Sequence, residues 1–148
     1  MPTGICSIVR IGGLKKSTGR AVVFLVCNGE LNGKSVFDGL PAARDREVRS
    51  RFEYWIDGHD SPKTYFHGWD DSEYHHCFCF KWKNNTVDQR LYGFKYRSKN
   101  NPRFQLCVLV LHAAKSAKNT DLTILNEINR LRLDKKVIAA IEAYLEGK

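Results

Sequence analysis

Long apolar stretches are missing from this chain. No run reaches the roughly twenty apolar residues that a membrane-spanning helix needs. Residues 1–10 also lack the basic start and the apolar core of a secretory signal peptide. Internal repeats and low-complexity linkers are missing as well. These absences predict one folded domain of 148 residues that is cytoplasmic, in a bacterial or phage setting.

The pattern of a disulfide-rich protein is also missing. The chain has an odd number of cysteines, so they cannot all form pairs: Cys6, Cys27, Cys77, Cys79 and Cys107. Most of them lie in apolar, strand-like runs, so we expect reduced thiols that pack as small buried side chains. The neighbouring His75 and His76 suggest a zinc-bound module as an alternative. Strand alternation would point adjacent ligands to opposite faces, however, so we expect neither a metal nor another cofactor.

Carboxylates are absent between Gln89 and Thr120, although the whole chain has 16 of them against 24 basic side chains, for a formal charge of +8. This window carries His112 and seven cations: Arg90, Lys95, Arg97, Lys99, Arg103, Lys115 and Lys118. A solvated surface normally mixes both signs, so a window of one sign predicts a surface that binds an anion, with a polyphosphate as the leading candidate. The alternative is a basic edge that only favours solubility.

Hydrophobic periodicity predicts strands in five segments: Ile5–Ile11, Gly19–Cys27, His75–Lys83, Arg90–Arg97 and Arg103–His112. The last three follow one another through short turns, which predicts an antiparallel meander. Leu106–Leu111 is apolar on both faces, as expected of a central strand. The glycine-rich basic segment 12–19 reads as a hairpin loop, since its spacing does not match a phosphate-binding loop.

Helical periodicity predicts one amphipathic helix from Asp38 to Gly58, with Asp38 as its cap. A short helix is expected to start at Ser61-Pro62 and to break at Gly68. Thr120 or Asp121 is expected to cap a further helix, after a basic loop over residues 113–119. Asp134 caps the last one. The predicted fold class is α+β, with a small curved antiparallel sheet packed against helices.

The basic residues would converge in such a meander. Arg90 and Arg97 bracket one strand, Arg103 starts the next and His112 ends it. Several cations and an imidazole would then surround one phosphate without a metal. RNA cleavage through the 2′-hydroxyl needs a base, an acid and cations that stabilise the extra charge on phosphorus. Tyr92 and Tyr96 are candidates for stacking on bases, with core packing as their alternative role.

Three segments of this region match a known pattern: Trp82-Lys83, Arg90-Leu-Tyr-Gly-Phe94, and Leu109-Val-Leu-His-Ala-Ala-Lys115 followed by Lys118, Thr120 and a helix. Together they resemble the RelE/ParE toxin superfamily, in particular its HigB-like, phage-derived branch. The resemblance covers about residues 40 to 132. The chain departs from the family pattern in the loop after His112, in the helix that follows, which lacks the usual alanine-x-x-arginine signature, and in the strand-like material of its first thirty residues. Ala114 stands where the family has an aromatic residue, and the lysines after His112 are spaced differently.

The resemblance implies a RelE-like domain over residues 1–148 with a strand-like extension over residues 1–36. It further implies a toxin of a type II toxin–antitoxin pair, which cuts mRNA on the ribosome and is bound by an antitoxin protein. In that function His112 and Lys115 are the acid and base, and Arg97 and Arg103 stabilise the transition state. The RNA-binding residues would be Arg90, Lys95, Lys99, Lys118, Tyr92 and Tyr96. The alternative is a noncatalytic RelE-like module that binds nucleic acid or protein.

Overall fold

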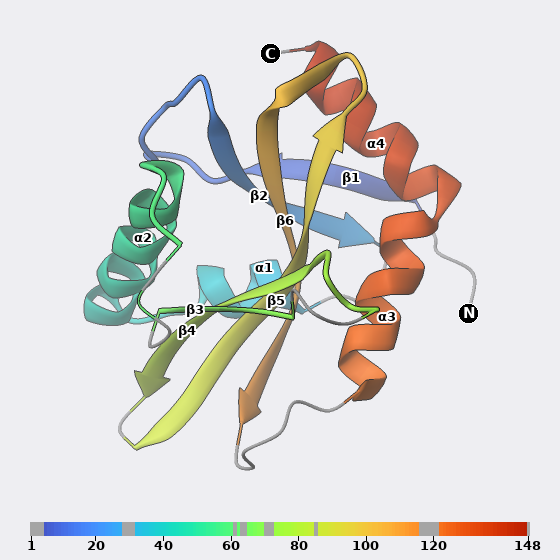
Figure 1. Cartoon of the computed structure of the whole chain (residues 1–148). Coiled ribbons are helices and arrows are strands. Elements are labelled where there is room, and N and C mark those ends of the chain that lie inside the picture. Colours follow the sequence, from blue (N-terminus) through green and yellow to red (C-terminus); the bar gives the residue numbers. More distant parts are fainter. Residues whose placement is uncertain are drawn as a thin grey trace.

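The computed structural model is an α+β domain in which helices cover both faces of a six-stranded mixed sheet (Figure 1). It describes residues 5–27, 32–60, 62, 65–69, 73–84, 86–115 and 122–147. The strands are β1 (Cys6–Arg10), β2 (Arg20–Cys27), β3 (Phe66–Gly68), β4 (Cys77–Asn84), β5 (Val87–Ser98) and β6 (Asn101–Lys115). The helices are α1 (Gly33–Asp38), α2 (Ala42–Ile56), α3 (Leu122–Leu133) and α4 (Lys135–Glu146).

The sheet has the strand order β1-β2-β6-β5-β4-β3. Strands β4, β5 and β6 form the predicted antiparallel meander, and β6 is central as expected. The expectation of a purely antiparallel sheet was wrong, because β2 pairs with β6 in parallel. Parallel neighbours need a long crossover, and here the chain between them includes both α1 and α2.

The helix predicted from Asp38 to Gly58 is α2, which begins later, at Ala42, and Asp38 belongs instead to the preceding short helix α1. Asp38 ends α1, where its carboxylate pairs with Lys34, instead of capping a longer helix. Pro41 occupies the N-cap of α2, and proline disfavours a helical conformation in the preceding residue, which separates the two helices. Gly58 follows the end of α2 with a positive φ of 105°. Among the described residues, no helix combines the length and apolarity needed to cross a bilayer.

Two other boundaries differ from the prediction. Residues 66–68 form strand β3 rather than helix, because Phe66 pairs with Phe80 of β4 and packs in the core. Strand β6 continues to Lys115, three residues past the predicted end, because residues 88–90 of β5 extend alongside it. The expected cap of α3 at Thr120 or Asp121 lies outside the described residues. The cap of α4 is confirmed: an Asp134 carboxylate oxygen accepts from the backbone N–H groups of Lys136 and Val137.

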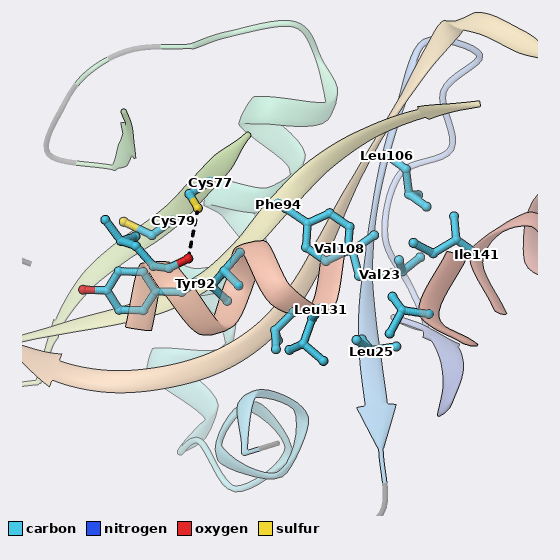
Figure 2. Close-up of a cluster of buried hydrophobic side chains, with 14 of the residues drawn as sticks. Val23, Leu25, Cys77, Cys79, Tyr92, Phe94, Leu106, Val108, Leu131 and Ile141 are labelled. Atoms are coloured by element: carbon cyan, nitrogen blue, oxygen red, sulfur yellow. Dashed lines mark hydrogen bonds between the residues drawn. The ribbon is translucent and has the colours of Figure 1, made fainter. Parts of the chain in front are cut away.

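The sheet separates two apolar cores. One lies under α3 and α4 and the other under α1 and α2. Alternation along the strands assigns each side chain to a face, so Tyr92 and Phe94 point to the first core and Leu91 points to the second, as predicted. Figure 2 shows the first core, with Cys77, Cys79 and Tyr92 near one end and Ile141 of α4 near the other.

The prediction of five reduced cysteines was wrong for two of them. Cys6 and Cys27 lie directly opposite each other at the end of the β1–β2 pair, with their Cα atoms 4.4 Å apart, and form a disulfide. This distance is within the range that a disulfide requires. Cys77, Cys79 and Cys107 are free thiols and are buried, as expected.

Candidate nucleic-acid interface

The predicted RNA-binding residues lie mostly on β5 and β6, which form one long hairpin. Ser98 pairs with Asn101 at the turn, whereas Arg90 pairs with Ala113 near the other end. At about 3.3 Å per residue, Arg97 and Arg90 are roughly 23 Å apart along the strand. The hairpin therefore divides the predicted residues between its turn end and its open end, and they do not surround one phosphate.

The turn end carries Arg97, Lys99 and Arg103, all of them exposed. The Arg97 guanidinium donates a hydrogen bond to the carbonyl oxygen of Pro102 at 2.9 Å. This end is not free of acid in space, because α4 brings Glu142 to it. The Glu142 carboxylate accepts hydrogen bonds from the hydroxyl groups of Tyr96 and Ser98.

Three of the predicted RNA-binding residues on β5 make contacts within the fold. Burial, together with the hydrogen bond to Glu142 and its charge, raises the pKa of Tyr96 to about 12, so its hydroxyl stays protonated at neutral pH. Lys95 lies on the opposite face, with its Nζ 5.3 Å from the centre of the Phe78 ring. The Tyr92 side chain is only 2% exposed and packs in the α3-side core. This is the alternative to base stacking that the sequence left open.

Arg90 lies at the open end of the hairpin, on the side of the sheet that α3 covers. Its side chain shares this face with Lys81, the residue directly opposite on β4, so two cations are neighbours across the strands. Arg90 is only 8% exposed, and its Nε atom is buried with no hydrogen-bond partner among the described residues. A buried cation with an unpaired N–H is costly to the fold.

Aromatic side chains lie next to this pair of cations. His67, Cys79 and Tyr92 are register partners in one row across β3, β4 and β5, adjacent to the row of Lys81 and Arg90. The Trp69 ring lies 4.5 Å from the His67 ring and 6.3 Å from the Tyr92 ring, centre to centre. We call Arg90, Lys81, His67, Trp69 and Tyr92 the Arg90 site. Lys81, His67 and Trp69 lie outside the carboxylate-free window 89–120, so the sequence did not identify them as site residues. For Lys81, the alternation along β4 gave only the face of the sheet on which it lies.

His112 is held on the other face of the sheet. His112 pairs with Leu91, after a register shift between Tyr92 and Gly93. Register partners share a face of the sheet, and the Leu91 side chain lies in the α2-side core. The His112 backbone N–H donates to the Asn32 side chain at 2.8 Å, and its carbonyl accepts from the same side chain at 3.2 Å. Its ring lies 5.8 Å from the ring of Trp82.

The chemistry of His112 follows from this packing. Its Nε2 atom is hydrogen-bonded to the Gln89 carboxamide oxygen at 2.6 Å. An amide oxygen only accepts, so Nε2 carries the proton and Nδ1 is the nitrogen that can take one. Burial lowers the pKa of His112, which keeps the ring neutral at pH 7. His112 therefore has the protonation state of a general base, but Arg90 is on the opposite face.

Of the two predicted lysines after His112, the structure describes only the backbone of Lys115. Lys115 ends β6, where its backbone pairs with Asp88, and its side chain is outside the described residues. Lys118 also lies outside the described residues. The same end of the hairpin bears Lys83, whose ammonium group is 3.8 Å from the Asp88 carboxylate.

The histidine and cysteine cluster near β4 does not assemble a ligand set. In the described part of the chain, no group of three or more His, Cys, Asp or Glu side chains is placed to hold a metal ion. Instead, the His75 and His76 rings lie 4.1 Å apart, and the Cys77 sulfur faces the Leu125 carbonyl oxygen at 3.8 Å. Burial raises the pKa of Cys77 to about 11 and that of Cys107 to about 12, so neither thiol is a ready nucleophile.

Comparisons with protein-family models, with curated proteins and with solved structures gave no match to this chain.

Proposed function

We propose that the chain binds single-stranded RNA through the Arg90 site. The observation that carries this proposal is the Arg90 side chain itself, a cation that is 8% exposed and has an unpaired Nε. Folding leaves this N–H without a partner among the described residues, and the guanidinium group that carries it is one that binds phosphate oxygens through charge-assisted hydrogen bonds. Lys81 supplies the second positive charge on the same face.

The neighbouring rings make a nucleic acid a better ligand than a simple anion. Trp69 is partly exposed, and its ring lies 6.3 Å from that of Tyr92, in the row next to Arg90 and Lys81, so an unpaired base can stack on it. Duplex RNA keeps its bases stacked inside the helix, so stacking of this kind selects single strands. The net charge of +8 adds a sequence-independent attraction to phosphates.

The test is fluorescence anisotropy with a labelled single-stranded RNA and the matching duplex, at salt concentrations between about 50 and 200 mM. Wild-type protein should prefer the single strand. Lys81→Gln and Trp69→Ala should weaken binding about tenfold, since each removes one phosphate contact or one stacked base. Lys135→Gln removes an equal charge from an exposed position on α4 and should leave affinity nearly unchanged.

Variants at the turn end locate the interface. Arg97→Gln and Arg103→Gln should bind RNA as wild type does, because both residues lie at the turn end and Arg97 is roughly 23 Å from Arg90 along β5. Loss of binding in these two variants, with full binding in Lys81→Gln, would place the interface at the turn end. That result would reject the Arg90 site.

A second function, ribosome-dependent mRNA cleavage by a toxin that an antitoxin controls, is favoured by His112. Its ring is neutral, and Gln89 and Asn32 fix its position, as a general base requires. Because Arg90 and His112 lie on opposite faces, RNA would have to cross the end of β5 and β6 to meet both residues. The resemblance to RelE-like toxins and the helix-packed meander support this function.

Induced expression in a bacterial host separates the two functions. A toxin should stop growth and produce new 5′ ends in mRNA, and His112→Gln should restore growth while RNA binding persists. Arg46→Gln, a charge change at an exposed position on α2, is the matched control and should remain toxic. Normal growth with intact mRNA, together with RNA binding by the purified protein, would reject the toxin and retain the binding module.

A further inference from the structure

Strand β2 extends past the end of its neighbour β1, and this leaves a cavity beside it. The last β1–β2 pair joins Arg10 to Val23, whereas Arg20, Ala21 and Val22 pair only with β6. A cavity of about 590 Å³ occupies the place where β1 would have continued. Its other walls come from the connection 11–17 and from the ends of α2 and α4. This volume is within the range of small-molecule sites.

The interior of this cavity is largely apolar. Val22 and Ile56, each 4% exposed, lie in the α2-side core and contribute to the wall. Ile11 and Leu14 pack against the same core from the connection between β1 and β2. Ala143 belongs to the wall on the α4 side. An apolar ligand body placed here would pass from water into contact with apolar side chains.

The charged side chains that line the cavity are all basic: Arg10, Lys15, Lys16 and Arg20. Two of them have partners outside it. Lys15 pairs with Asp57 at 2.7 Å. Arg20 pairs with Asp60 at 3.2 Å and donates to the Trp55 carbonyl oxygen at 2.9 Å.

Arg10 and Lys16 are different, because neither has an ion pair with another described residue, and both are exposed. Arg10 is also close enough to Tyr144, a further lining residue, for its charge to act on that hydroxyl. Burial raises the pKa of Tyr144, while the positive charge of Arg10 opposes the rise. The cavity thus joins an apolar interior to two positive charges that are free to meet a ligand.

We propose that this cavity binds an amphipathic organic anion, with an apolar body in the cavity and one anionic headgroup at Arg10 and Lys16. The apolar wall requires the body, and the two cations require the headgroup. A carboxylate and a phosphate monoester share this chemistry. The site is on the far side of β2 and β6 from the Arg90 site and does not depend on RNA binding.

Calorimetric titration with decanoate, decyl phosphate, decanol and inorganic phosphate tests both parts of the ligand. Decanoate, decyl phosphate or both should bind at least tenfold more tightly than decanol and than inorganic phosphate. Comparison of the two anions identifies the preferred headgroup. Equal binding of decanol would remove the role of the cations, and equal binding of inorganic phosphate would remove the role of the apolar interior. Failure of both amphipathic anions to bind would reject the proposal.

Two variants locate the site. The double change Arg10→Gln and Lys16→Gln should raise the Kd for the better anion at least tenfold. The matched change Arg46→Gln and Lys135→Gln removes the same charge from exposed helix positions and should leave the Kd unchanged. Amide chemical shifts of the wild-type protein should move at Ile11, Ala21 and Ala143 on titration. Shifts confined to the Arg90 site would overturn the assignment even if the double variant fails to fold.

Discussion

Replacement of Arg90 by methionine should stabilise the fold and weaken RNA binding at the same time. Methionine follows the path of the arginine stem, so the packing around the 8% exposed side chain is largely kept. The change removes a buried N–H that has no partner among the described residues, and leaving such a group unpaired costs about 1–3 kcal/mol. It also removes the positive charge opposite Lys81.

We therefore expect the free energy of unfolding to rise by about 1–3 kcal/mol, in line with other replacements of buried charges by apolar residues. For a chain of this size each kcal/mol corresponds to roughly 3 °C in Tm. Urea unfolding of wild type and Arg90→Met measures the difference. Arg46→Met, an exposed arginine on α2, should change stability by less than about 0.5 kcal/mol.

The RNA affinity of the same variant supplies the second half of the test. Arg90→Met should bind single-stranded RNA about tenfold more weakly, and the slope of log affinity against log salt should fall by about 1. A stability loss above about 1 kcal/mol would instead assign Arg90 a structural role. If Arg90→Met is more stable but binds RNA as tightly as wild type, Arg90 does not contact RNA, and the proposed role of this buried cation is refuted.

Three further outcomes follow from the fold. Gly93→Ala should cost about 3 kcal/mol in urea unfolding, because its Cβ would lie 2.0 Å from the Val108 carbonyl oxygen; Gly39→Ala, whose nearest contact would be 3.5 Å, is the control. Burial lowers the pKa of His112, so the stability from its neutral ring is complete above the unfolded pKa of about 6.5 and falls as the pH drops below it. Between pH 7 and pH 5, His112→Gln should lose less stability than wild type, and an equal loss would contradict the buried neutral ring. Alkylation of the unreduced, denatured protein should label Cys77, Cys79 and Cys107 only, whereas labelling of all five cysteines would contradict the Cys6–Cys27 disulfide.

Local sequence patterns predicted the elements that depend on local physics. The period of two along β4 and β5 assigned Tyr92 and Leu91 to their faces, because alternation is a property of each strand alone. Asp134 was identified as a cap because its partners are the next backbone N–H groups in the chain. The hairpin of β1 and β2 and the meander also follow from short connections.

The candidate site depended on pairings that no local pattern contains. Parallel pairing of β2 with β6 joins segments far apart in the sequence. The register that sets Cys6 against Cys27 is likewise not contained in the pattern of either strand alone. The register shift near Gly93 precedes the pairing of His112 with Leu91, on the face opposite Arg90. Glu142 comes from α4 to the turn end of a window that has no carboxylate of its own. The absence of acids in a sequence window is therefore no guarantee of their absence in space.

Charge that can act on a ligand is the charge that folding leaves unpaired. Helix α2 is rich in arginine, yet Arg44 and Arg51 both pair with Glu47, and Arg49 pairs with Asp45. These ion pairs satisfy the guanidinium groups locally, so α2 adds little to the field that a phosphate meets. Arg90 has no such carboxylate among the described residues, and folding nevertheless buries it. That contrast, rather than the number of cations in the window, distinguishes the Arg90 site from an ordinary basic surface.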